Sequence, residues 1–510
     1  MKKQTLVIKP QEEYSYGHII KALAGGLYPD KFHVIREYIQ NSFDSIANWK
    51  TSQKDKSCEI KITIQKPSIF IFDNGTGMTR HTLNEYRKVG YSKKVVGESA
   101  GFRGIGKLSG ISVAKKLIVT TSPYGINEKY ILTFDAESMI REIDELKRKK
   151  ANIPLNTLIE KHTSLSSSSE DKSTHYTMVE LHEIKSDSKI LFTKLKILDY
   201  ISKNTPVPFD PKFIYGKNIE DNIKKFVADY DCINISVDGK YLFKPYLSTI
   251  KSPQHILVWH NKDKNKLLGF CWYCENSEKG QIRPLDKSGI IYRYKNFAVG
   301  DHELPRRTLW NTSPHLSYYF IGEIYICNSE MIPTSQRDDF EQNVARDQFY
   351  NNGQVIANEL NRLARDSSGI RRAEEYVKRG VEVISEIKSD VDNKESSLKD
   401  LGAQKIAKLV NVIDNIEKRK KNIPKTDINT KRLAKRVVKQ AKKLLKKVEE
   451  VGKTEKDEYN IIKKLKLDKQ AEQLYTTIIR TLKDYFVDKP EALENIIKII
   501  HKNLINTFRK

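Results

Sequence analysis

Cysteine is scarce in this sequence, and long apolar runs are missing. Five cysteines in 510 residues provide no disulfide framework and suit a reducing compartment. No run approaches the roughly 18 apolar residues that a membrane span needs, and the basic N-terminus lacks the apolar stretch of a signal peptide. We therefore expect a cytoplasmic protein with no transmembrane helix.

The one close pair of cysteines is Cys271 and Cys274, in the segment LLGFCWYCEN. A single C-x-x-C can be half of a zinc site or a redox motif, but a four-ligand site needs a second pair, and none follows at a matching spacing. His255 and His260 are the nearest other ligand types. The simpler interpretation is a mostly apolar strand that happens to contain two cysteines, and both interpretations stay open.

Acidic residues are too few to balance the basic ones, and the formal net charge is +25. The excess is concentrated near the C-terminus, where Leu401 to Lys510 holds 29 Lys/Arg against 14 Asp/Glu. Such a basic region indicates contact with a polyanion such as nucleic acid. The alternative is a solvated helical face whose lysines only keep the chain soluble, and charge alone does not separate the two.

A chain of this length exceeds what one hydrophobic core usually supports. Residues 14–50 have helical periodicity, and apolar or β-branched strands surround a glycine-rich segment between residues 58 and 135. The stretch from Ile140 to Lys172 is charged and then serine-rich, which predicts a mobile loop. The segment TMVELHEI restores a strand pattern, so an α/β domain is expected over residues 1–186.

Two further domains are predicted. Residues 187–360 mix helices with aromatic-rich strands such as YFIGEIYICN, as in a second α/β domain. Proline nearly vanishes after about Gln354, and helical periodicity continues, so residues 361–510 are expected to form a basic helical or coiled-coil extension. An apolar seam is predicted there, formed by Leu433, Val437, Leu444, Val448 and Val451.

Three polar residues of the first strong helix fall on one face. Glu37, Asn41 and Asp44 stand at i, i+4 and i+7. An amide oxygen can ligate Mg²⁺, and a carboxylate can orient or deprotonate a water molecule, as ATP hydrolysis requires. Taken alone, the same spacing also fits an ordinary charged helical face.

The segment Asp73-Asn74-Gly75-Thr76-Gly77-Met78 follows an apolar strand. A carboxylate at the strand end can accept a hydrogen bond from the amino group of adenine, while Gly75 and Gly77 let the backbone approach the base. A plain Asp-Asn-Gly turn is the alternative interpretation.

A second glycine-rich segment contains Gly101, Gly104, Gly106 and Gly110 around Phe102, Arg103 and Lys107. Its backbone N–H groups could bind phosphate oxygens, with a cation beside them. The spacing is not that of a P-loop, because Leu108 follows Lys107 where serine or threonine is required.

Together these elements resemble the nucleotide-binding motifs of the GHKL superfamily, which includes gyrase B, MutL, the MORC proteins and the ninety-kilodalton heat-shock chaperones. The first helix resembles the E-x-x-x-N-x-x-D helix, and DNGTGM resembles the D-x-G-x-G motif. A fourth motif is similar to HYTMVELHEI, with Thr177 in the threonine position and Tyr176 where glycine is usual. The matching segments are REYIQNSFDSI, DNGTGM, GFRGIGKLSG and HYTMVELHEI.

The resemblance implies a Bergerat-type ATP-binding domain and a role for each matching residue. Glu37 would activate the attacking water, Asn41 would hold Mg²⁺, and Asp73 would bind adenine. Asp44 would support the helix and the pocket. The other nucleotide contacts implied are Gly75, Gly77, Met78, Gly101, Phe102, Arg103, Gly104, Ile105, Gly106, Lys107 and Thr177.

In such families a lid closes over the nucleotide as the protein dimerises, and a second domain supplies a cation to the terminal phosphate. The segment EMIPTSQRDDFEQN is the candidate here, and Arg337 is the expected cation. The alternative for Arg337 is a surface ion pair with Asp338 or Asp339.

The rival functions differ in the sequence features that each requires. A histidine kinase carries a phosphoacceptor helix before the ATP domain, a topoisomerase needs a cleavage domain with an active tyrosine, and a nicking MutL needs a C-terminal metal motif; none of these patterns is recognised here. The expectation is an ATP-gated dimeric clamp or chaperone-like machine that acts on nucleic acid or a partner protein, in DNA repair or phage defence. The alternative is an interaction module that binds ATP to dimerise with little turnover.

Overall fold

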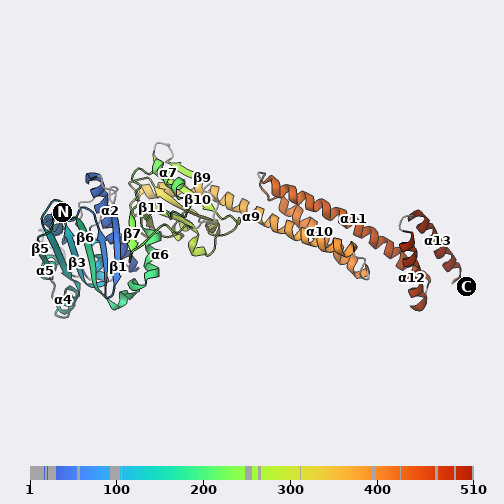
Figure 1. The fold of residues 1–510 in the computed structure, drawn as a ribbon, viewed down its shortest axis with the longest axis horizontal. Helices are drawn as coiled ribbons and strands as arrows, with labels where there is room; N and C mark the ends of the chain where they lie inside the picture. The colour runs from blue at the N-terminus through green and yellow to red at the C-terminus, as the bar shows by residue number, and fades with distance from the viewer. Residues whose placement is uncertain are drawn as a thin grey trace, which may run out of the picture. The chain divides into compact units, whose positions relative to one another are not determined.

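The computed structural model describes most of the chain. Its described residues are 17, 20, 30–53, 58–91, 104, 106–246, 255–261, 266–310, 312–392, 398–425, 427–465, 469–486 and 490–507. The chain divides into two compact units, Met1–Ala364 and Arg365–Lys510. The fold is mixed α/β, with two sheets in the first unit and helices in the second (Figure 1).

An eight-stranded mixed sheet carries the N-terminal part of the first unit. Its order is β5-β4-β3-β6-β2-β1-β7-β8, so β6 lies between β3 and β2 and is antiparallel to both. The strands are β1 Glu59–Gln65, β2 Ser68–Asp73, β3 Ala114–Ser122, β4 Lys129–Asp135, β5 Thr163–Ser168, β6 Tyr176–Ile184, β7 Asn234–Val237 and β8 Lys240–Tyr241. Because β7 and β8 join this sheet, it extends past the predicted domain boundary at residue 186.

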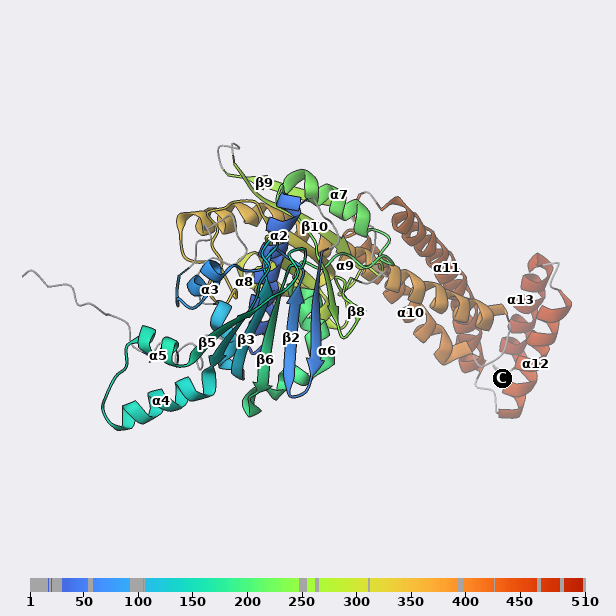
Figure 2. The same cartoon turned by 60° about the vertical axis from the view of Figure 1, so that its left-hand side comes forward.

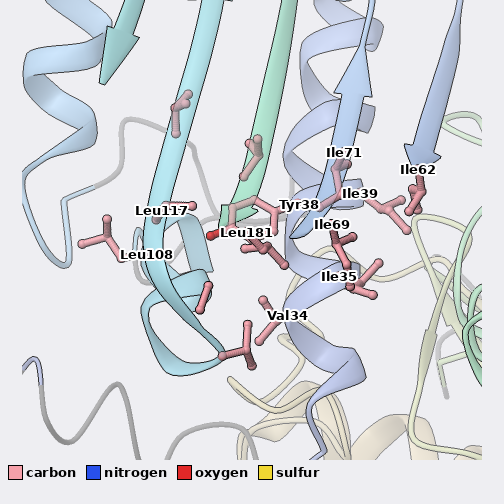
Figure 3. Close-up of a cluster of buried hydrophobic side chains, with 14 of the residues drawn as sticks. Val34, Ile35, Tyr38, Ile39, Ile62, Ile69, Ile71, Leu108, Leu117 and Leu181 are labelled. Carbon is pink, nitrogen blue, oxygen red and sulfur yellow. The ribbon is translucent and has the colours of Figure 1, made fainter. Parts of the chain in front are cut away.

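Helix α2, Phe32–Gln53, packs on this sheet through one apolar face. The side chain of Asp30 accepts a hydrogen bond from the backbone N–H of Phe32 at its start, which satisfies one of the unpaired donors of the first turn. Figure 3 shows Val34, Ile35, Tyr38 and Ile39 gathered against isoleucines of β1 and β2 and leucines of β3 and β6. Burial of this face holds α2 in a fixed position over the strand ends that carry the candidate site.

The serine-rich stretch corrects one prediction. The stretch from Ile140 to Lys172 is not a mobile loop, because helix α4, Ala136–Arg148, extends into it and helix α5 covers Leu155–Lys161. Residues 163–168 form β5, which pairs antiparallel with β4 from Lys129↔Ser168 to Phe134↔Thr163. The strand lies at the edge of the sheet, so backbone hydrogen bonds to β4 order it although most of its side chains are exposed. Composition predicted the exposure correctly, but it could not predict the pairing partner.

The second sheet has the order β12-β11-β13-β10-β9, with β11 and β13 parallel. Its strands are β9 His255–His260, β10 Leu267–Glu275, β11 Gly289–Tyr294, β12 Phe297–Val299 and β13 Phe320–Ile326. Each face of this sheet is covered by a buried apolar cluster. Helix α7, Gly216–Phe226, contributes to the cluster on one face. Helix α8, Glu303–Thr308, and the start of α9, Val344–Asp392, contribute to the cluster on the other face. The shorter helices of this unit are α3 Arg80–Tyr86, α4 Ala136–Arg148, α5 Leu155–Lys161, α6 Lys194–Asn204 and the 3₁₀ segments η1 Gly106–Ser112, η2 Ser186–Phe192, η3 Leu285–Lys287 and η4 Pro314–Tyr319 (Figure 2).

The described residues of the second unit form helices and the connections between them, with no strand. Helices α10, Leu398–Lys420, and α11, Ile428–Leu465, share a buried apolar cluster with the later turns of α9. Helices α12, Lys469–Tyr485, and α13, Pro490–Thr507, follow. Of the predicted seam, Val437, Leu444 and Val448 are buried in this cluster, whereas Leu433 is 46% exposed, and the side chain of Val451 lies outside the described ones.

No helix among the described residues is long and apolar enough to cross a membrane.

Candidate nucleotide site

The polar face of α2 lies at the boundary between core and solvent. Glu37, Asn41 and Asp44 are half-buried, whereas their neighbours Tyr38, Gln40 and Phe43 are buried. The i, i+4, i+7 spacing therefore brings one amide and two carboxylates together along two turns of a helix that the core holds rigidly. The three residues are arranged as the sequence predicts.

Asp73 ends β2 and is 3% exposed. The hydroxyl of Ser42, on α2, donates to its Oδ2 at 2.8 Å, and the backbone N–H of Gly75 donates to its Oδ1 at 3.0 Å. Burial raises the pKa of Asp73 to about 6, and these hydrogen bonds act in the opposite direction by stabilising the carboxylate. The carboxylate is thus held by both the helix and the loop that follows the strand.

The two glycines that follow are required by close packing. A Cβ at Gly75 would lie 2.2 Å from Oγ of Ser45, and a Cβ at Gly77 would lie 2.0 Å from the carbonyl oxygen of Ser122. Gly77 also has a φ of +68°, in the left-handed region that favours glycine. The loop between Asp73 and Met78 consequently lies directly against α2 and the end of β3.

Thr177 reaches this loop through a second threonine. Its Oγ1 lies 3.1 Å from Oγ1 of Thr121, its register partner on β3, and the Thr121 hydroxyl also accepts a hydrogen bond from the backbone N–H of Met78 at 2.9 Å. Thr177 is the register partner of Asp73 as well. Sheet pairing thus brings the predicted residues Asp73, Met78 and Thr177 together, with Tyr176 stacked on Phe72 beside them.

The glycine-rich segment is described in part. Gly104, Gly106 and Lys107 belong to the described residues, whereas Gly101, Phe102, Arg103 and Ile105 lie outside them. A Cβ at Gly106 would lie 2.0 Å from Oε2 of Glu37, so the start of η1 passes directly over the carboxylate predicted to activate water. Tyr38 fixes the other end of η1, because its hydroxyl accepts a hydrogen bond from the N–H of Gly110 at 2.8 Å.

Lys107 makes contacts that its predicted role did not include. Its Nζ donates to the carbonyl oxygens of Glu85 and Tyr91, at 3.0 and 2.8 Å, and its own carbonyl oxygen accepts a hydrogen bond from the hydroxyl of Tyr86 at 2.7 Å. In this structure the side chain therefore joins η1 to the end of α3 and the segment after it.

Arg337 is buried, with 5% of its surface exposed, so the alternative of a surface ion pair is wrong. Asp338 instead accepts a hydrogen bond from Thr334, and Asp339 pairs with Arg346 at 3.2 Å. Arg337 has a φ of +54°, and its guanidinium carbon lies 5.9 Å from the ring centroid of Phe297. The side chain thus lies inside the folded unit, beside the Phe297 ring.

The charge of Arg337 is coupled to the polar face of α2. Burial lowers its pKa to about 10, the nearby positive charge of Arg36 acts in the same direction, and the carboxylates of Glu37 and Asp44 act against both. Arg337 lies in the segment between β13 and α9. Its charge therefore interacts with that of the predicted catalytic carboxylate of Glu37, although about 300 residues of sequence separate them.

Two contacts join α2 to the surroundings of Arg337, one to the residue before it and one to Phe297 of β12, whose ring lies beside its guanidinium. The guanidinium of Arg36 donates to the carbonyl oxygen of Gln336 at 2.9 Å, and the rings of Phe43 and Phe297 meet edge to face, 5.5 Å apart. Sequence reasoning missed these residues, together with Ser42 and Thr121. Ser42 lies inside the helical motif and Thr121 ends a predictable strand, but nothing in the sequence indicates Phe297.

The cysteine pair does not form a metal site. Cys271 and Cys274 lie on β10 three residues apart, so their side chains point to opposite faces of the sheet, and each belongs to a different apolar cluster. Burial raises the pKa of both thiols, that of Cys274 to about 12. One metal ion cannot bind both, and no group of three metal-binding side chains occurs among the described residues.

Helix α2 offers only a few side-chain oxygen atoms that could bind Mg²⁺. Magnesium bound with a nucleotide usually takes one or two protein ligands and completes its shell with phosphate oxygens and water. A half-buried amide at Asn41, one turn from Glu37 and near Asp44, fits such a ligand.

One family model matches the chain, over residues 30–169, and is described as histidine kinase-, DNA gyrase B-, and HSP90-like ATPase. No curated protein matches. The matched residues include α2, the Asp73 loop and the glycine-rich segment, which are the elements that the geometry brings together. Residues 30–169 therefore form an ATPase domain of the histidine kinase, DNA gyrase B and HSP90 type, the GHKL superfamily that the motifs resemble.

Proposed function

We propose that this chain is a cytoplasmic, Mg²⁺-dependent ATPase that closes as an ATP-gated dimeric clamp. The observation that carries the proposal is the burial of Arg337, from outside the matched ATPase domain, beside α2, where its charge interacts with that of Glu37. A cation in that place can stabilise the charge that develops on a terminal phosphate.

Each side chain has a distinct part in this proposal. Asp73 accepts a hydrogen bond from the adenine amino group, and Glu37 orients and deprotonates the attacking water. Asn41 holds the magnesium ion, which would offset the negative charge of the phosphates when bound. Asp44 supports the pocket from the next turn of α2.

A nucleotide-switched scaffold that binds ATP with little turnover is the alternative. Glu37 favours hydrolysis, because its carboxylate lies on the half-buried polar face of α2 directly against the start of η1, where Gly106 has no side chain to displace it. A pure binder has no need of a carboxylate there.

The change Glu37→Ala tests the two functions. We expect ATP affinity to remain near that of the wild type while turnover falls about a hundredfold or more, because general-base catalysis acts only in the transition state. Calorimetry would measure binding, and phosphate release would measure turnover. Glu160→Ala, at an exposed position of α5, is the matched control and should behave as the wild type.

A wild-type chain that binds ATP without releasing phosphate would favour the scaffold. Equal turnover in wild type and Glu37→Ala would remove this carboxylate from the mechanism.

We further propose that the client is a nucleic acid bound by α11. Successive residues of an α-helix are turned by about 100° about its axis, and on this basis the exposed cations of α11 fall within an arc of about 140°. The apolar residues on the other side, including Val437 and Leu444, are buried in the helical cluster. The exposed cations are Arg432, Lys435, Arg436, Lys439, Lys442, Lys443, Lys446 and Lys447.

One ion pair is recorded on this arc among the described residues, between Lys442 and Glu417 at 2.8 Å. Because few acidic side chains pair with these cations, the surface can bind the phosphate backbone of a nucleic acid. Such binding depends on charge more than on base sequence. A partner protein with an acidic surface is the other client that such an arc could bind.

A further inference from the structure

Gln40 is a buried amide whose hydrogen-bonding groups are not used. The side chain is 1% exposed, and neither Oε1 nor Nε2 has a hydrogen-bond partner among the described residues. Because buried polar groups are nearly always paired, such an amide costs the folded protein free energy. Residues that break this rule are expected at functional sites.

Helix geometry places Gln40 on the face of α2 that meets Gln336 and Phe297. Arg36 precedes it by one turn and donates to the carbonyl oxygen of Gln336, and Phe43 follows within one turn and packs on Phe297. Gln40 lies on the same face of α2, between these two contacts. Arg337 comes directly after Gln336, and its guanidinium lies beside the Phe297 ring.

The charges around Arg337 favour a neutral hydrogen-bond acceptor beside its guanidinium. The carboxylates of Glu37 and Asp44 favour the charged form of Arg337, and the positive charge of Arg36 opposes it. An amide oxygen can accept a hydrogen bond from a guanidinium and orient it without neutralising it.

We propose that Gln40 is a positioning residue for Arg337: its amide oxygen accepts a hydrogen bond from the guanidinium when that group faces the terminal phosphate of bound ATP. This role rests on the proposed ATPase function. The amide is unused without nucleotide and becomes paired as the reaction proceeds, so the cost of its burial in the free protein is recovered in the transition state.

The change Gln40→Met tests the role, because methionine has a similar length and no hydrogen-bonding amide. The melting temperature should rise, ATP affinity should stay the same, and turnover should fall about ten- to a hundredfold, as for a lost hydrogen bond to a charged group. A lower melting temperature would overturn the proposal, since it would mean that the amide is paired in the free protein. Unchanged turnover would overturn it equally.

A double-mutant cycle separates positioning from any independent effect. In an Arg337→Met background, Gln40→Met should lower turnover no further, because the group on which the amide acts is already absent. Additive losses in the double variant would overturn the proposal.

Asn361→Leu is the matched control. Asn361 lies on α9, is 6% exposed, and has a buried Oδ1 without a partner among the described residues. Its replacement should raise the melting temperature and leave turnover unchanged, which shows that relief of a buried amide does not by itself slow hydrolysis. Absence of turnover in the wild type would contradict the ATPase function, whereas turnover that Gln40→Met leaves intact contradicts only the role of Gln40.

Discussion

Burial of the Asp73 carboxylate opposes folding at neutral pH. Burial raises its pKa above the value of 3.8 expected in the unfolded chain, to about 6, so the folded protein binds this proton more tightly. Its favourable contribution to stability is therefore present below pH 3.8 and is lost as the pH rises through about 6. At neutral pH the protein holds a buried carboxylate at a cost of about 3 kcal/mol.

The change Asp73→Asn should remove that cost and abolish nucleotide binding. At pH 7.5 the variant should be more stable than the wild type by up to about 3 kcal/mol, with the difference vanishing below about pH 4. ATP affinity should be lost, because an amide can present a donor where the adenine amino group also donates. Urea unfolding at the two pH values and calorimetry at pH 7.5 measure both effects.

The exposed Asp171→Asn is the control for Asp73→Asn and should bind ATP normally. Normal ATP affinity in Asp73→Asn would contradict the adenine role of this carboxylate.

Helix α2 combines three faces, and each face has a different set of contacts. One face builds the core, a second face carries Glu37, Asn41 and Asp44, and a third meets the Arg337 segment through Arg36 and Phe43. The first two faces follow from helical spacing, so they could be predicted from the sequence. The third could not, because its partners, Gln336 and Phe297, come more than 200 residues later in the sequence.

Helix α11 carries a prediction of its own. Changing Lys435, Arg436, Lys439 and Lys443 to glutamate should weaken DNA or RNA binding strongly and flatten its dependence on salt, because each phosphate contact releases about one counterion. Basal ATP hydrolysis should remain. Fluorescence anisotropy at two salt concentrations, with wild type and variant, measures the effect.

Residues 147–150 offer a matched control for the α11 variant. Lys147, Arg148, Lys149 and Lys150 are all exposed, and their reversal to glutamate changes the net charge by the same amount. Equal loss of affinity in both variants, or a wild-type affinity that does not respond to salt, would contradict binding through α11.

At the scale of the whole molecule, nucleotide binding should be coupled to association. A non-hydrolysable ATP analogue with Mg²⁺ should convert the chain to a dimer or tighten an existing one, because closure over the phosphates couples nucleotide contacts to a new interface. Sedimentation velocity with and without the analogue measures this, and Asp73→Asn should show no response. A single mass under both conditions, with unchanged small-angle scattering, would be evidence against a clamp.

The ATPase domain could be predicted from the sequence because its motifs are local. The spacing of Glu37, Asn41 and Asp44 and the order Asp73, Gly75, Gly77 each depend on a helix or a strand end formed by neighbouring residues. Residues 30–169 match a family model for the same reason, since short segments carry the chemistry.

Only the tertiary structure decided what pairs across long stretches of sequence. Strand β5 is ordered by β4, Cys271 and Cys274 are separated by the sheet that contains them, and Arg337 is buried against α2 rather than exposed beside Asp338. The first outcome depends on which strand supplies the backbone hydrogen bonds, and the other two depend on which surfaces are buried together. Both are properties of the packed chain and not of any local pattern.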